Sequence, residues 1–129
     1  MTTEKQVYRS GALSHIYAQA VRVGNVIHVA GQVGTDADGE PLPGLEAQVR
    51  QIYAKLAAVL PEVGATVENV VAETWYVTDM AELMSQSGPV FAARAAALGP
   101  NPAVAQTLVQ VSALFRPGLK VEVAFVAVV

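Results

Sequence analysis

The sequence predicts a single α+β domain, residues 1–129, in which two helices lie on one face of a mixed β-sheet. Three observations lead to this prediction. The length of 129 residues suits one domain. Two stretches, 45–60 and 80–98, place apolar residues at three- and four-residue spacing, which is typical of helices. Strand-length runs of β-branched residues lie before, between and after them.

The first third of the chain predicts strands and a loop. Residues 5–8 form a short first strand, and 17–23 and 26–32 flank Gly24-Asn25, a two-residue turn that suits a tight hairpin. Because 26–32 is apolar at nearly every position, we expect this strand to be buried on both faces. Residues 34–44, rich in Asp, Gly and Pro, indicate a loop.

The remaining elements follow from periodicity and from helix-breaking residues. The helix 45–60 carries one apolar stripe, and 70–79 is a strand of β-branched and aromatic residues. Pro89 lies inside the helix 80–98, so we expect a kink there or a late start at 87–89. The last two strands, about 103–113 and 119–128, read as an apolar hairpin.

The composition indicates that copies of the chain associate. Apolar residues make up 53% of the chain and charged residues 15%, against about 25% charged in typical soluble domains. With so little polar material to cover the surface, part of it should be buried in an apolar interface between copies.

Several classes of function and location are disfavoured. The net charge of −3, without a cluster of Lys or Arg, argues against nucleic acid as a partner. No apolar run reaches the ~20 residues that cross a bilayer, so no membrane partner is expected. The N-terminal MTTEKQVYRSG lacks the pattern of a signal peptide, and cysteine is absent, so we expect a cytoplasmic protein.

No metal or cofactor is expected from the residues. His15 and His28 are the only histidines, and neither has a second ligand at metal-binding spacing. Neither a G-x-S-x-G elbow nor a phosphate-binding loop is present. In the final strand Glu122 alternates with valines, which predicts a side chain that faces solvent or an interface.

Tyr17 and the pair Gln106-Thr107 stand out because they are polar residues at the starts of apolar strands. A tyrosine can donate a hydrogen bond from an apolar wall, and a glutamine amide both donates and accepts. The plainer alternative is that these are strand-end residues in contact with solvent.

The whole sequence resembles the Rid family of reactive-intermediate deaminases, also called the YjgF family. The resemblance is carried by five parts of the chain: Tyr17-Ala18-Gln19, VIHVAGQVGTD (26–36), the loop DGEP with Gln48 in the helix after it, VGATVENVVAETWYVTDM (63–80), and TLVQVSAL with LKVEVAFVAV near the C-terminus. It implies a fold like that of chorismate mutase and a homotrimer with active sites in clefts between subunits. It also implies hydrolysis of an enamine or imine, such as 2-aminoacrylate, to a keto acid and ammonia.

The resemblance also implies site residues. In the deaminase members an arginine binds the substrate carboxylate, a tyrosine from the neighbouring chain and a backbone group near the G-Q turn shape the cleft, and a Cys or Thr and a glutamate hold water. Tyr17 and Gly31 retain this pattern. The arginine position becomes Gln106, or Val104 under another alignment, and the other two positions become Leu108 and Ala124.

These departures predict a cleft for a small neutral molecule, lined by Gly31, Thr107, Leu108 and Ala124, with Tyr17 and Gln106 in catalytic roles. A neutral amide cannot replace the charged two-pronged grip of a guanidinium on a carboxylate. The usual 2-imino acids are therefore disfavoured, unless Arg94 or Arg116 takes over that grip.

Three functions remain open, and the sequence does not decide whether the protein is an enzyme. The first is a deaminase-like hydrolase acting on a neutral enamine or imine. The second is a trimer that binds a small ligand without catalysis. The third and weakest is an endoribonuclease, a label that some relatives carry.

Overall fold

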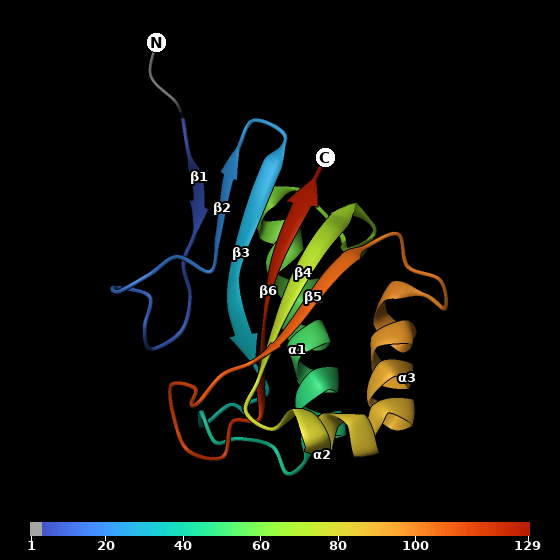
Figure 1. The fold of residues 1–129 in the computed structure, drawn as a ribbon. Helices are drawn as coiled ribbons and strands as arrows, with labels where there is room; N and C mark the ends of the chain where they lie inside the picture. The colour runs from blue at the N-terminus through green and yellow to red at the C-terminus, as the bar shows by residue number, and fades with distance from the viewer. Residues whose placement is uncertain (1–3) are drawn as a thin grey trace.

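The computed structural model describes residues 4–129, and its α+β architecture confirms the predicted fold class (Figure 1). Six strands form one sheet in the order β1-β2-β3-β6-β4-β5. Every neighbouring pair is antiparallel except β4 and β5, which run parallel. The strands are β1 (Gln6–Tyr8), β2 (Ala20–Val23), β3 (Val26–Val33), β4 (Val70–Val77), β5 (Ala105–Gln110) and β6 (Val121–Val128).

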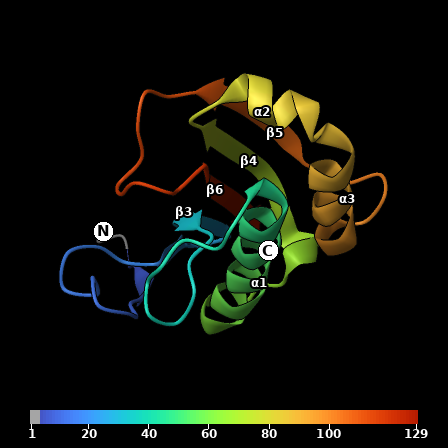
Figure 2. The same ribbon diagram turned by 90° about the horizontal axis from the view of Figure 1, so that it is seen from below.

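The helices cover one face of the sheet (Figures 1 and 2). They are α1 (Leu45–Val59), α2 (Met80–Ser85) and α3 (Ser87–Leu98), with short 3-10 turns at η1 (Leu60–Val63) and η2 (Val67–Asn69). The predicted helix 80–98 is interrupted at Gln86, as the position of Pro89 indicated. Pro89 lies in the first turn of α3, where a missing backbone N–H leaves no hydrogen bond unmade.

The hairpin predicted at Gly24-Asn25 is confirmed, but the one predicted at the C-terminus is wrong. Val23 pairs with Val26 across the first turn, and Gly24 has the positive φ of 58° that such a turn requires. β5 and β6 are not neighbours, because β4 lies between them. β5 pairs in parallel with β4, so the chain must cross to the other side of β4 before β6 can pair antiparallel with both β3 and β4.

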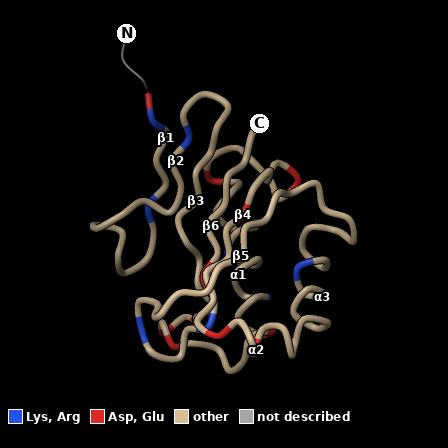
Figure 3. Tube along the Cα trace, viewed as in Figure 1, with Lys and Arg blue, Asp and Glu red and all other residues tan. Residues whose placement is uncertain are grey.

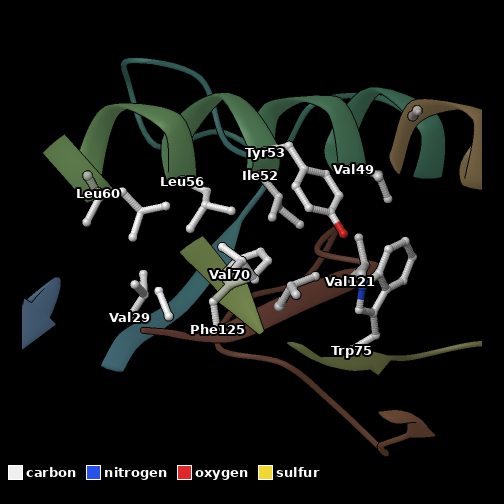
Figure 4. Packing of buried hydrophobic residues seen from close by; sticks show 14 of the residues in the cluster. Val29, Val49, Ile52, Tyr53, Leu56, Leu60, Val70, Trp75, Val121 and Phe125 are labelled. Carbon is white, nitrogen blue, oxygen red and sulfur yellow. The ribbon is translucent and has the colours of Figure 1, made fainter. Parts of the chain in front are cut away.

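The core lies between α1 and the helix-facing side of the central strands. Figure 4 shows Ile52, Tyr53 and Leu56 pointing from α1 toward Phe125 on β6. The Tyr53 ring meets Phe125 edge-on with 5.7 Å between centroids, and Trp75 stacks on Phe91 of α3 at 5.6 Å. Burying each large apolar side chain contributes about 1.5–3 kcal/mol, which is why the apolar stripe determines how α1 docks.

The other face of the sheet, here called the open face, has no helix over it (Figure 2). On β3, Ile27 and Val29 are buried, whereas Val26 is 40% exposed and His28 is exposed. The prediction that this strand is buried on both faces is therefore wrong for the single chain, because nothing within residues 4–129 covers the open face. Most charged residues lie in loops and near strand ends, and β5, at the sheet edge, contains neither a charge nor a proline (Figure 3).

Gln48 joins two loops at one end of the sheet. This fully buried residue of α1 donates from Nε2 to the backbone oxygens of Leu42, at 2.8 Å, and Gly118, at 2.9 Å. Its Oε1 accepts from the Lys120 backbone N–H at 2.9 Å. Gly34 packs so closely that a Cβ there would overlap the Gln48 backbone. One side chain thus satisfies three partly buried backbone groups.

We expect Gln48→Ala to lower the free energy of unfolding by about 3 kcal/mol, because three backbone groups would lose their hydrogen-bond partner and a fully buried side chain would be removed. Urea unfolding followed by circular dichroism measures the change. Arg50→Ala, on the exposed side of the same helix, removes only a surface ion pair with Glu46 and should cost about 0.5 kcal/mol or less. Equal losses in the two variants would contradict the role assigned to Gln48.

Candidate functional site

The two predicted catalytic residues lie at opposite ends of the sheet. Tyr17, 39% exposed, lies in the loop between β1 and β2, and Gln106 lies on the edge strand β5. β2 and β5 are four strand intervals apart, which corresponds to about 19 Å. Tyr17 and Gln106 of one chain therefore cannot contact the same small molecule.

The other predicted site residues divide between the two faces of the sheet. Thr107 pairs with Thr74 of β4, which pairs in turn with Ala124 of β6, so these three form a row on the open face. Leu108 packs against the core on the helix side. The pleat of β5 places Gln106 on the helix side as well, where it bonds to Glu73.

The row of small residues leaves a hollow in the open face. It has a volume of about 140 Å³, and its lining includes Ala72, Thr74 and Ala124, with His28 and Val126 beside them. Such a concave surface can receive a small molecule or a side chain from another copy of the chain.

Glu122 lies on the same face, two residues before Ala124. Its alternation with valines predicts a side chain that faces solvent or an interface, but it is not among the residues that the sequence assigned to the cleft. It is half-buried and pairs across the sheet with Tyr76 of β4 and Val33 of β3. A Cβ at Gly31 would overlap the Glu122 carboxyl group, so glycine at this position makes room for it. Burial raises the pKa of Glu122 above the ordinary value for a glutamate, because the charged form is less well solvated there.

A second polar cluster, here called the Glu73 cluster, lies on the helix side of the sheet. The Glu73 side chain is fully buried and accepts from the Tyr53 hydroxyl at 2.5 Å, Arg94 Nε at 2.6 Å and Gln106 Nε2 at 3.0 Å. Burial, followed by the charge of Glu73, raises the pKa of Tyr53. Gln106 in this chain is therefore one of three donors to a buried carboxylate.

The neighbours of Glu73 on β4 could have revealed this cluster. Glu73, Trp75 and Val77 alternate along the strand and all point toward the helices. In Figure 4 the Trp75 indole nitrogen and the Tyr53 hydroxyl point toward each other. Within residues 4–129, Trp75 Nε1 makes no hydrogen bond. Because alternate residues of a strand face the same side, this spacing places Glu73 on the buried face, and a buried carboxylate needs a charged partner.

Neither arginine considered for the carboxylate grip lies on the open face. Arg94 pairs with Glu73 on the helix side. Arg116 donates to the backbone oxygen of Gly39 and pairs with Glu40 at 3.2 Å, which ties two loops together. Within residues 4–129, no three side chains of His, Asp or Glu gather as metal ligands, and no helix has the length and apolarity to cross a membrane.

These features define a class: a two-layer α+β protein with an uncovered sheet face that carries a hollow and a protonatable carboxyl group beside a glycine. Comparison with known proteins makes the class specific. The family model described as Endoribonuclease L-PSP matches residues 8–129. The chain belongs to this family, which is the Rid or YjgF family that the sequence resembles.

Individual relatives agree with the assignment. The RutC family protein YjgH of Escherichia coli is 34% identical over 83 residues, or 61% of this chain and 63% of that protein. The mouse 2-iminobutanoate/2-iminopropanoate deaminase is 36% identical over 66 residues, 50% of this chain and 49% of its own length. The crystal structure of Rv2704 from Mycobacterium tuberculosis, a member of the YjgF/YER057c/UK114 family, has a TM-score of 0.80 at 32% identity and covers 98% of this chain and 100% of that one. The chain thus spans between about half and just under two thirds of these two curated relatives.

We expect Glu122→Gln to stabilise the protein more at pH 7 than at pH 4. Since burial raises the folded-state pKa, the protonated carboxyl is accommodated at low pH, and stability is lost as pH rises through that pKa. The glutamine of the variant carries no charge at either pH, so the difference in unfolding free energy between the variant and the wild type should grow with pH. Urea unfolding at both pH values measures it, with the exposed Glu68→Gln as control. A gain that is equal at both pH values would contradict the shift.

Proposed function

We propose that this chain forms a homotrimer whose inter-subunit clefts bind a small neutral molecule and hydrolyse an enamine or imine. The observation that carries the proposal is the separation of Tyr17 from Gln106 across the width of the sheet. The family includes a mouse protein named as a deaminase of imino acids, which supports the reaction class. The number of subunits rests on the family resemblance.

An inter-subunit cleft explains three features of the single chain together. Tyr17 of one copy can approach Gln106 of the next, although the two cannot meet within a chain. The apolar open face and the edge of β5 both lack a cover in the single chain, and a neighbouring copy would supply one. The low content of charged residues agrees with such burial.

Glu122 is the group best suited to move protons in this cleft. Hydrolysis of an imine adds water to the C=N carbon and then breaks the C–N bond, so that ammonia leaves and a carbonyl remains. An ionised Glu122 can take a proton from water, and the same group can then deliver it to nitrogen. We assign it the water-holding role that the resemblance placed at Ala124, two residues along the same face. Tyr17 would hydrogen-bond the substrate, and the Gly31 backbone would hold a polar atom of it.

The absence of a guanidinium from the open face favours a neutral substrate. Hydrogen bonds to charged groups contribute about 1.5–3 kcal/mol each, roughly twice the neutral kind. A carboxylate held without the arginine fork should therefore bind about a hundredfold more weakly.

The two other candidate functions have less support. A trimer that only binds its ligand would need no protonatable carboxyl beside Gly31. Cleavage of RNA is supported only by the description of the family. The net charge is −3, and several cations, Arg94 and Lys120 among them, are paired with carboxylates and so are not available to bind phosphates.

The reaction is tested with 2-iminopropionate and its neutral amide, 2-iminopropanamide, each generated in the cuvette while ammonia release is timed against the uncatalysed rate. We expect faster turnover of the amide and a loss of about 10²-fold or more in Glu122→Gln. Glu68→Gln should keep wild-type rates. Saturable binding of the amide without ammonia release would favour the non-catalytic alternative, and preference for the carboxylate would contradict the neutral cleft.

The shared cleft is tested by mixing two inactive variants, Tyr17→Ala and Gln106→Ala. If each cleft takes one of these residues from each of two neighbours, random assembly leaves about a quarter of the clefts intact and restores about a quarter of the activity. The double variant Tyr17→Ala/Gln106→Ala alone should stay inactive. Native mass spectrometry verifies the mixing, and mixed trimers without activity would rule out a cleft built from both residues.

A further inference from the structure

We propose that Glu73 orients the Gln106 amide so that its carbonyl oxygen faces the cleft, and that the cleft therefore selects ligands that present an N–H donor. This inference rests on the proposed function, since it requires Gln106 to reach the cleft between copies. It assigns Glu73 as a positioning residue that acts through Gln106.

The orientation follows from hydrogen-bond chemistry. A glutamine amide has a donor end and an acceptor end, and only the donor end can face an ionised carboxylate. Glu73 forms an ion pair with Arg94, whose Nε lies 2.6 Å from its Oε2, and Gln106 Nε2 lies 3.0 Å from the same oxygen. The reversed amide would place its oxygen against this carboxylate oxygen, which is strongly unfavourable.

The other end of the amide is free. Within residues 4–129, no donor hydrogen-bonds the Gln106 Oε1, and the residue is exposed on the edge strand. Gln106 therefore presents its carbonyl oxygen and its second amide N–H outward, while the first N–H is held by Glu73.

The electrostatics of the Glu73 cluster agree with an uncharged or N–H-bearing ligand. Arg94 compensates the charge of Glu73, and its Nε is held by that carboxylate on the helix side. A ligand carboxylate would meet the carbonyl oxygen of Gln106 and no compensating cation there. The N–H of an imine, enamine, amide or lactam would donate a hydrogen bond to this oxygen. A ligand without an N–H would leave the oxygen unpaired and should bind more weakly.

The selectivity is tested with two ring compounds of similar shape, 2-pyrrolidinone, which carries an N–H, and γ-butyrolactone, which carries a ring oxygen instead. Ligand-observed NMR titration of the wild-type protein should show the lactam binding about tenfold or more tightly than the lactone. Gln106→Met, an exposed substitution of similar length, should abolish the preference. Equal binding of the two probes, a preference retained in Gln106→Met, or no binding of either probe would overturn the inference.

A second measurement reads the orientation without any ligand. The Gln106 side-chain amide should give one proton that is shifted downfield and protected from exchange, because it bonds a buried carboxylate. Glu73→Gln, or Arg94→Met if that variant does not fold, should remove the protection. An unprotected amide in the wild-type protein would overturn the inference. Neither measurement needs turnover, so a protein that shows the lactam preference but releases no ammonia would refute the proposed hydrolysis alone.

Discussion

The buried carboxylate of Glu73 is the interaction on which the arrangement of this molecule depends. Its three donors come from α1, α3 and β5, so one side chain connects both long helices to the edge of the sheet. A buried charge is tolerated only when it is fully paired, and removing one partner commonly costs about 3–5 kcal/mol. α3 and β5 each donate a hydrogen bond to Glu73 of β4, so the position of one element depends on the other. A shift of α3 would therefore change the contacts at the edge of the sheet.

The two faces of the sheet serve different needs. The helix side holds the core and the Glu73 cluster, which together stabilise the single chain. The open face carries small residues, a hollow and Glu122, which the single chain leaves partly exposed. A carboxyl group whose pKa is raised by burial costs stability at neutral pH, and such costs are typical of sites retained for chemistry.

Sequence patterns predicted most helices and strands correctly because each of these elements depends on residues that are close together in the chain. The stripe of α1, the Gly24-Asn25 turn and the break near Pro89 each depend on a few neighbouring residues. The order of β5 and β6 depends on which distant strands pair, and an apolar strand–turn–strand does not specify that. Gln106 was placed in a cleft from the family pattern alone. Its bond to Glu73 joins residues 33 positions apart, and only the parallel register of β4 and β5 reveals it.

The uncharged edge of β5 also has a bearing on how the protein is made in a cell. Natural sheets commonly protect their edges with lysine, proline or a bulge, and the six residues AQTLVQ have no charge or proline among them. A newly synthesised copy therefore exposes a strand edge that can pair with another extended chain, next to an uncovered apolar face. Until another chain covers these surfaces, such a copy is at risk of aggregation.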